Sequence, residues 1–231
     1  MQYLCAYCKE NLITDVDKLI RVIVTQRIDY IKNYKEIRES TDQKLSEWLI
    51  QAGCLPIPIS NKLIIIHNDK DTLVNEQPMF KNWLSTINPN ALLLSGGNDI
   101  GDYPERDATE HYLLNWAKDQ RIPVLGICRG MQMMSIWSKG KLVKINNHVN
   151  TIHKLKICDQ DKKWPSEVNS YHEWGLIDCP PDFEIKAHAD NGVIEAIKHN
   201  KLPWEGWMWH PERETPFMDI DIKRLKALFN N

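Results

Sequence analysis

The residue best suited to chemistry in this sequence is Cys128, which lies between Gly126 and Gly130. An apolar run precedes this segment and a helical pattern follows it, so the pattern predicts a tight strand-to-helix turn with a cysteine at its centre. Such a turn strains its middle residue and lifts that side chain clear of the sheet. The positive end of the following helix then favours a thiolate. We predict that Cys128 is a nucleophile; the alternative is a buried structural cysteine.

A histidine and an acid near the end of the chain could activate such a thiol. His210 and Glu212 are separated by Pro211, which stiffens the spacing between them. In extended backbone, residues two apart point to the same side, so Glu212 can reach the imidazole ring. Because His210 follows Cys128 by a long stretch of chain, only the fold can bring the two together. A surface turn is the alternative interpretation.

A second glycine-containing segment follows another apolar run. Gly96 and Gly97 lie between Ser95 and Asn98, and glycines there let backbone N–H groups approach a ligand closely. One of these N–H groups, together with that of Arg129 after the nucleophile, could form an oxyanion hole. Taken alone, the segment is better interpreted as an ordinary turn at the end of a strand.

The elements that position these residues follow two patterns. Up to about residue 140, strand-like runs alternate with amphipathic helical patterns, which predicts βαβ units on a parallel sheet. The predicted strands are residues 22–24, 55–59, 91–94 and 123–127, and the predicted helices are residues 41–52, 80–87, 104–117 and 129–137. Short strands follow at residues 142–145, 152–157, 183–189, 193–199 and 206–210, and a last helix at residues 219–229. We therefore predict an α/β fold with a mostly parallel central sheet flanked by helices and a small antiparallel β region in the second half.

Composition and charge exclude several classes of protein. The chain has 231 residues and a formal charge of −2, so there is no basic surplus for nucleic acid. There is no run of about 18 apolar residues for a membrane span, and charged residues interrupt the first twenty. We predict a cytoplasmic protein with reduced thiols, in which residues 1–20 form an N-terminal extension and residues 21–231 one domain. A homodimer is left open.

The cysteines give no sign of a metal site. Cys5 and Cys8 form a lone Cys-x-x-Cys pair, and a structural zinc site needs a second pair of ligands at defined spacing, which does not follow. We predict no metal and no organic cofactor.

Taken together, these segments resemble the class I glutamine amidotransferase domain over residues 21–231. Residues 106–110 read RDATE and residues 168–172 read VNSYH. These two segments resemble a helix start and an Asn-Ser-x-His loop of the free-standing γ-glutamyl hydrolases, the peptidase C26 or γ-glutamyl-γ-aminobutyrate hydrolase branch. The resemblance implies a three-layer fold with Cys128 as nucleophile, His210 as general base and acid, and Glu212 orienting the imidazole. It also implies an oxyanion hole from Gly97 and Arg129. The implied substrate-binding residues, which would lie near the glutamyl amino and carboxylate groups, are Asn98, Gln132, Asn169, Ser170 and His172.

The resemblance implies a hydrolase that cleaves the γ-glutamyl amide bond of a small conjugate through a Cys128 thioester and releases glutamate. The conjugate we expect is γ-glutamyl-CDP-amidate, in capsular phosphoramidate synthesis. Relatives commonly continue the loop as His-His-Gln, whereas this chain has Glu173 and Trp174 after His172, which puts a γ-aminobutyrate substrate in doubt. Of the tryptophans in loop-like segments (Trp164, Trp174 and Trp204), one could stack on a nucleobase of the leaving group.

Two other functions remain alternatives. The chain could be a glutaminase subunit that passes ammonia to a partner synthase, because chemistry at the thiolate would be identical. It could also be an inactive relative that binds a ligand or a partner.

Overall fold

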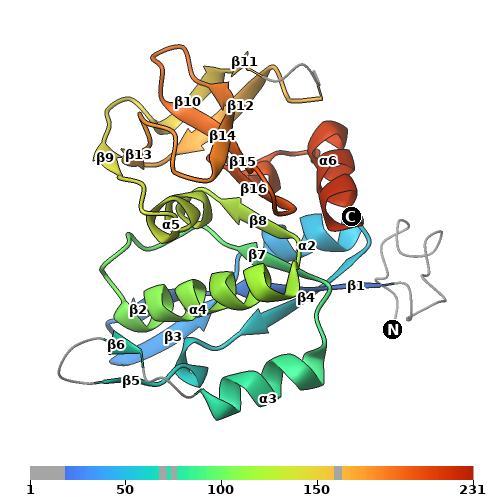
Figure 1. Cartoon of the computed structure of the whole chain (residues 1–231). Coiled ribbons are helices and arrows are strands. Elements are labelled where there is room, and N and C mark those ends of the chain that lie inside the picture. Colours follow the sequence, from blue (N-terminus) through green and yellow to red (C-terminus); the bar gives the residue numbers. More distant parts are fainter. Residues whose placement is uncertain (1–18, 68–71, 74–76, 159–162, 231) are drawn as a thin grey trace, which may run out of the picture.

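The structure is a computed structural model that describes residues 19–67, 72–73, 77–158 and 163–230 (Figure 1). Residues 1–18, which make up most of the predicted N-terminal extension and include Cys5 and Cys8, lie outside the described residues. The first strand, β1 (Ile20–Thr25), begins one residue before the predicted domain boundary. No described helix combines the length and the apolar character that crossing a membrane requires.

One large sheet forms the centre of the described chain. Its strands are β1, β4 (Cys54–Ile59), β7 (Ala91–Leu94), β8 (Val124–Ile127), β11 (Lys156–Ile157), β14 (Phe183–His188), β15 (Ile194–His199) and β16 (Trp204–Trp207). They lie in the order β11-β14-β15-β16-β8-β7-β1-β4. The pairs from β16 to β4 are parallel, whereas β11, β14 and β15 add an antiparallel edge. The predicted α/β architecture with a mostly parallel sheet is therefore confirmed.

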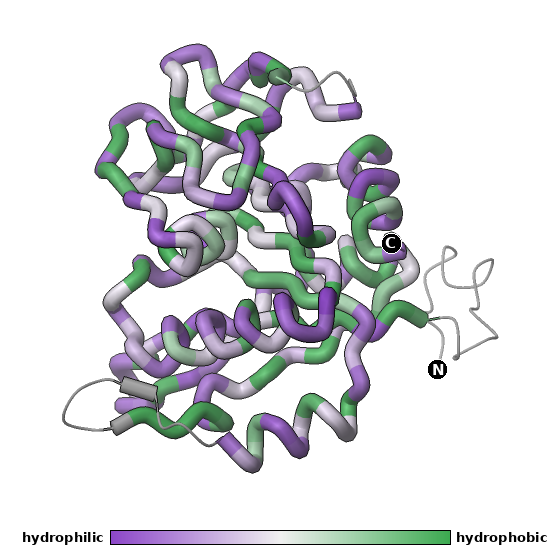
Figure 2. The backbone as a smooth tube through the Cα atoms, viewed as in Figure 1, coloured by the Kyte–Doolittle hydropathy of each residue, from purple (hydrophilic) through white to green (hydrophobic). Residues whose placement is uncertain are grey.

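Helices cover both faces of this sheet and make three layers (Figure 1). On one face pack α2 (Gln43–Gln51) and α6 (Asp219–Phe229); on the other pack α3 (Pro78–Ile87), α4 (Pro104–Gln120) and α5 (Arg129–Trp137). Side chains alternate between the two faces along β1. Val22 and Val24 therefore pack in the core of the first face, and Ile23 packs in the core of the second. Figure 2 shows the resulting concentration of hydrophobic residues along the central strands.

Local sequence explains why these elements begin and end where they do. The Asp42 side chain caps α2 by accepting a hydrogen bond from the Lys44 N–H at 2.9 Å. Gly53, with φ 81°, ends that helical segment as the sequence predicts. The two prolines of β4 cannot donate ladder hydrogen bonds, and β4 lies at the edge of the sheet, where such strands are tolerated.

Smaller antiparallel pairs and two short 3₁₀ helices complete the described chain. The pairs are β2 (Arg27–Ile31) with β3 (Glu36–Ser40), β5 (Ile66–His67) with β6 (Thr72–Leu73), β9 (Val143–Lys144) with β13 (Trp174–Gly175), and β10 (Val149–Lys154) with β12 (Glu167–Tyr171). The 3₁₀ helices are η2 (Asn61–Leu63) and η3 (Pro211–Arg213).

Four differences from the sequence prediction concern the larger elements and the site. The hairpin β2–β3 is not predicted, and residues 167–171, expected in a loop, form β12. The run predicted at residues 152–157 is divided between β10 and β11, which belong to different sheets. The strand predicted at residues 206–210 forms as β16, so the chain leaves the sheet before His210. That early exit lets His210 turn back over the carboxyl ends of the strands.

Candidate active site

Cys128 occupies the sharp turn between β8 and α5. Its φ of 50° and ψ of −106° lie in a strained region for a residue with a side chain. The turn is held by the Cys128 N–H, which donates to the Trp207 carbonyl at 2.8 Å. Two flanking glycines make it possible, because a Cβ at Gly130 would collide with the backbone of Leu94, and one at Gly126 would lie 2.6 Å from the carbonyl carbon of Gly130. The sulfur-bearing residue is buried except for 7% of its surface.

His210 and Glu212 form a buried pair next to this thiol. His210 Nδ1 lies 2.6 Å from Glu212 Oε1, and both side chains are at most 5% exposed. Burial lowers the pKa of His210, but the negative charge of Glu212 and the interaction with Cys128 outweigh burial and raise it to about 9. The ring is thus an imidazolium at neutral pH, held between a carboxylate and a sulfur.

Asn169 on β12 fixes the backbone of His210. Its Oδ1 accepts the His210 N–H at 2.9 Å, and its Nδ2 donates to the His210 carbonyl at 2.8 Å. The same Nδ2 donates to Glu214 Oε1 at 2.6 Å. The amide therefore acts on the position of the imidazole through the main chain.

The glycine loop after β7 lies against the imidazole. A Cβ on Gly96 would lie 2.7 Å from His210 Cε1, so the ring requires a glycine there. Gly97 has a φ of 114°, a conformation that favours glycine, and it lines the same cavity as Cys128. Asn98 then anchors the loop to the hairpin β2–β3, because Ile28 donates its N–H to Asn98 Oδ1 and accepts from Asn98 Nδ2, both at 2.8 Å.

A buried ionic network, which we call the arginine–carboxylate network, holds that loop through hydrogen bonds to its backbone. It consists of Arg106, Asp107 and Glu110 on α4 and Arg129 on α5. Glu110 contacts both guanidinium groups, and Arg129 also contacts Asp107. Arg106 Nη2 donates to the carbonyls of Ser95 and Gly96, each at 2.9 Å. The network thereby fixes the peptide that precedes Gly97.

The electrostatics of this network follow from burial. Burial lowers the pKa of Arg106, which falls to about 10 although Glu110 opposes the shift. Burial raises the pKa of Glu110, but the charges of Arg129 and Arg106 outweigh it, so the pKa is lowered. Arg106 and Glu110 thus both remain charged at neutral pH.

These parts meet in one cavity of about 380 Å³. Its lining residues are Gly97, Asn98, Asp99, Cys128, Arg129, Gln132, Tyr171, His172, Glu173, His210 and Arg213. As the first residue of α5, Arg129 has an N–H without an acceptor inside the helix. The cavity therefore brings together a thiol, an imidazole backed by a carboxylate, and a helix start.

The predicted substrate-binding residues divide into two groups. Asn98, Gln132 and His172 line the cavity. Asn169 and Ser170 lie behind its wall: Asn169 holds His210, and the Ser170 hydroxyl donates to the His148 carbonyl at 2.7 Å. Their assignment to the substrate stays a prediction.

Four lining residues are not among the predicted substrate-binding residues: Asp99, Tyr171, Glu173 and Arg213, of which Glu173 is noted in the sequence only as a departure from relatives. Arg213 lies over the Tyr171 ring, with Cζ 4.4 Å from the ring centroid. Tyr171 and Glu173 flank His172 in the sequence, and Arg213 follows Glu212. Proximity to these motif residues was the only signal that could have found them.

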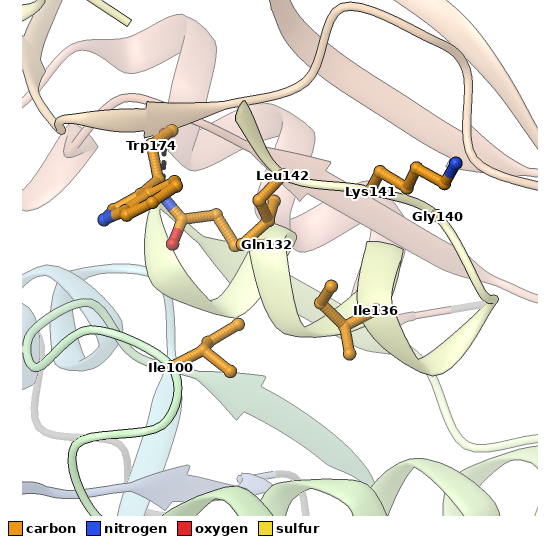
Figure 3. A pocket seen from close by; sticks show the side chains of 7 residues that line it. All are labelled: Ile100, Gln132, Ile136, Gly140, Lys141, Leu142 and Trp174. Carbon is orange, nitrogen blue, oxygen red and sulfur yellow. Dashed lines mark hydrogen bonds between the residues drawn. The ribbon is translucent and has the colours of Figure 1, made fainter. Parts of the chain in front are cut away.

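A second pocket of about 430 Å³ adjoins the cavity, with Gln132 lining both (Figure 3). Its other lining residues are Ile100, Ile136, Gly140, Lys141, Leu142 and Trp174. Gln132 Nε2 donates to the Trp174 carbonyl at 2.9 Å, and Trp174 Nε1 donates to Asp99 Oδ2 at 3.1 Å. Trp174 and Gln132 lie at one end of this pocket and Lys141 and Gly140 at the other.

Of the tryptophans considered for stacking on a base, only Trp174 lines a described pocket next to the cavity. Trp164 is 4% and Trp204 0% exposed, so neither offers a face to a ligand, and the prediction that one of the three stacks on a base stays open for Trp174 alone. Trp164 packs edge-on against Trp207 and Trp209.

The described cysteines Cys54, Cys128, Cys158 and Cys179 are free thiols.

Comparison with known proteins is consistent with this geometry. The family model for glutamine amidotransferase class-I matches residues 31–224. A gamma-glutamyl-CDP-amidate hydrolase of Campylobacter jejuni is 33% identical over 146 residues, which cover 61% of this chain and 70% of that protein. A glutamine-hydrolyzing GMP synthase subunit of Pyrococcus abyssi is 25% identical over 134 residues, covering 56% and 69%.

Solved structures show the same fold. A protein from Thermoplasma acidophilum, described as a GMP synthase subunit, superposes with a TM-score of 0.66 at 20% identity, covering 92% of this chain and 94% of that one. A glutamine amidotransferase from Thermotoga maritima superposes with a TM-score of 0.56 at 15% identity, covering 91% and 84%.

Proposed function

The chain belongs to the class I glutamine amidotransferase family, and from that premise we propose that it hydrolyses the γ-glutamyl amide bond of a small γ-glutamyl conjugate and releases glutamate. The observation that carries the proposal is the meeting of Cys128, the buried His210–Glu212 pair and the start of α5 in one cavity. This set of groups suits acyl transfer through a covalent intermediate. It includes a nucleophile, a proton carrier with its orienting acid, and backbone donors for an oxyanion.

In the proposed reaction, the Cys128 thiolate attacks the γ-carbonyl carbon and forms a C–S bond. The oxyanion accepts hydrogen bonds from the N–H groups of Gly97 and Arg129, an effect worth about 3 kcal/mol for each donor removed. The His210 imidazolium gives its proton to the amide nitrogen as the C–N bond breaks, which leaves a thioester and a free amine. His210 then takes a proton from water as the water attacks, and glutamate leaves when the C–S bond breaks.

Charged side chains of the cavity match the two ends of a glutamyl group. Asp99 and Glu173 offer carboxylates to its α-ammonium, and Arg213 offers a guanidinium to its α-carboxylate. Gln132 and His172 supply further polar groups on the same wall. We assign the glutamyl half of the substrate to this cavity.

The pocket beside it suits the leaving half. Ile100, Ile136, Leu142 and the indole of Trp174 give it apolar walls, and Lys141 adds a positive charge at the end opposite Trp174 (Figure 3). A nucleobase can stack on an indole, and a phosphate is attracted to an ammonium group. Since the Campylobacter relative is named for γ-glutamyl-CDP-amidate, we propose that conjugate as the substrate, with a role in capsule biosynthesis and a cytoplasmic location.

The test is a panel of γ-glutamyl amides incubated with pure protein, with glutamate release as the readout. The panel contains γ-glutamyl-CDP-amidate, γ-glutamyl-γ-aminobutyrate and glutamine. We expect the cytidine conjugate to have a kcat/KM at least 100-fold above the others, and Cys128→Ala to be folded and inactive. Equal turnover of all three would contradict the proposed substrate, and full activity of Cys128→Ala would contradict the mechanism.

A second candidate is a glutaminase subunit that supplies ammonia to a synthase. The relatives named as GMP synthase subunits favour it, because the same cavity would hydrolyse glutamine. In that case pure protein is idle on the panel and becomes a glutaminase only with a synthase and its acceptor present. Labelling of the Cys128 thiol by diazo-oxo-norleucine would be expected for both candidates and would exclude an inactive relative.

A further inference from the structure

Three histidines and a glutamate form a cluster behind the cavity wall, and of these only His172 also lines the cavity. We call His148, His153, His172 and Glu195 the histidine–glutamate cluster. His148 immediately precedes β10, His153 lies on β10, His172 immediately follows β12 and Glu195 lies on β15. One ligand atom from each of His148, His153 and Glu195 lies within 4.8 Å of the others. The side chains of His148 and Glu195 are 0% exposed and that of His172 is 1% exposed.

Glu195 is the anomalous member of this cluster. Within the described chain, neither of its carboxylate oxygens accepts a hydrogen bond. Its Oε1 lies 3.4 Å from His148 Nδ1 and 3.7 Å from His172 Nε2. Ordinary N–H···O bonds span about 2.7–3.2 Å, and a buried carboxylate without partners is strongly unfavourable. The groups nearest to this buried carboxylate are therefore two imidazole nitrogens that lie farther away than an ordinary hydrogen bond allows.

His172 points its second ring nitrogen into the same space. Its Nδ1 lies 2.9 Å from the Trp174 carbonyl, which can only accept, so Nδ1 donates a proton to that carbonyl. Its Nε2 lies 3.7 Å from Glu195 Oε1 and has no hydrogen-bond partner among the described residues. A metal ion between the two atoms would give a ligand role to both. An N–H donated to a backbone carbonyl is also how proteins hold metal-binding histidines.

Distances within the cluster fit coordination better than hydrogen bonding. Metal–ligand bonds of about 2.0–2.1 Å place the ligand atoms of a tetrahedral centre about 3.3–3.5 Å apart. The separations of 3.4 and 3.7 Å from Glu195 Oε1 are close to that spacing. We propose that His148, His153, His172 and Glu195 bind one divalent transition-metal ion of the zinc type. Imidazoles with a single carboxylate suit such ions, whereas Mg²⁺ and Ca²⁺ prefer sites built from oxygen atoms.

Neighbouring groups are arranged to support such a site. Asn191 Nδ2 lies 2.8 Å from His148 Nε2, and a half-turn of the amide would offer its oxygen to an Nε2–H when Nδ1 binds the ion. The Ser170 hydroxyl donates to the His148 carbonyl, which fixes the backbone on that side. An ion here would tie β10, β12 and β15 together behind His172, which lines the cavity. Its role is to stabilise that wall rather than to take part in the reaction.

The test is titration of tag-free, full-length protein with Zn²⁺ against a chromophoric chelator. Because Cys5 and Cys8 could bind zinc themselves, the experiment uses a Cys5→Ser/Cys8→Ser background alongside the wild type. We expect one equivalent per chain in this background and at least 100-fold weaker binding when His153→Gln is added to it. The matched control is His188→Gln, which removes a histidine on β14 whose Nδ1 contacts the Gly192 carbonyl, and it should bind zinc like its parent.

Two further measurements keep the outcome decisive. Co²⁺ in the Cys5→Ser/Cys8→Ser background should give visible bands without the near-ultraviolet charge-transfer band of a thiolate ligand. Saturating Zn²⁺ should raise the melting temperature of the parent and leave that of His153→Gln unchanged. Three results would overturn the proposal. They are the lack of a stoichiometric zinc site, the presence of a thiolate charge-transfer band, and a zinc affinity that is unchanged in both His153→Gln and Glu195→Gln. None of these readouts depends on hydrolysis, so failure here leaves the proposed function untouched.

Discussion

Two buried charged clusters flank the cavity, and they are completed in different ways. In the arginine–carboxylate network each carboxylate contacts a guanidinium, and Glu110 contacts two. In the histidine–glutamate cluster, the oxygens of Glu195 accept no hydrogen bond within the described chain. The first can hold the glycine loop by itself, whereas in the second the groups nearest to Glu195 are imidazole nitrogens at 3.4 and 3.7 Å.

The secondary structure explains this contrast. Arg106 and Glu110 are four residues apart on α4 and so lie on one face, where Arg129 of the adjacent α5 can reach them. The histidines come from β10 and from loop positions beside it and β12, and their side chains converge from several directions. Convergence of that kind suits a central ion better than pairwise contacts.

The largest expected effect is on stability, from breaking the complete network. Glu110→Gln leaves two buried guanidinium groups with a weakened partner, and we expect a loss of about 3–5 kcal/mol in the free energy of unfolding, measured by urea denaturation. Activity should also fall, because Arg106 holds the Gly96 carbonyl. The control is Glu105→Gln, since Glu105 pairs with the exposed Lys62 and should lose less than about 1 kcal/mol. Equal losses in the two variants would remove the contrast.

An intermediate effect is expected from the His210–Glu212 pair, through pH. The pKa of folded His210 is about 9, above its ordinary value of 6.5, so protonation of His210 favours the folded state. This contribution is complete below pH 6.5 and is lost as the pH rises through about 9, by at most about 3 kcal/mol. Urea denaturation between pH 6 and 9.5 should show the wild type losing this stability relative to His210→Gln. Parallel curves for the two proteins would contradict the assignment.

The smallest effect is expected from Glu195→Gln in metal-free protein. This change removes a charge that accepts no hydrogen bond within the described chain, so the free energy of unfolding should change by less than about 1 kcal/mol in either direction, far less than in Glu110→Gln. Added zinc makes the difference larger, because it should raise the free energy of unfolding of the protein that retains Glu195 but not that of Glu195→Gln. A loss as large as that of Glu110→Gln would mean that the histidines alone complete the cluster.

Sequence patterns predict the scaffold well where one face of an element is buried. The helical spacing of Leu45, Trp48 and Leu49 predicts α2, and the apolar run at residues 91–94 predicts β7. The hairpin β2–β3 escapes prediction because its residues are largely exposed or half-buried and show no apolar periodicity. Its place in the fold depends on Asn98, a contact that spans 70 residues.

In the candidate site, too, the sequence predicts the residues that lie in recognisable motifs but not the contacts between distant strands. Motif spacing predicts that Cys128, His210 and Glu212 belong together, and the structure brings them to one cavity; their catalytic roles stay predictions. Two features depend on strand pairing across the antiparallel region. One is the hydrogen bonding of Asn169 to the backbone of His210, and the other is the close approach of His148, His153 and Glu195. No spacing along the chain encodes that pairing.

The neighbouring pocket has a consequence for how this scaffold could change its substrate. Its residues Ile136, Lys141 and Leu142 lie at or just beyond the end of α5 farthest from Cys128. None of the three lines the cavity that holds the thiol and the imidazole. Substitutions at these three positions can therefore change which amine is accepted and leave the residues around the thiol and the imidazole unchanged. This pocket is accordingly a suitable starting point for directed evolution of selectivity.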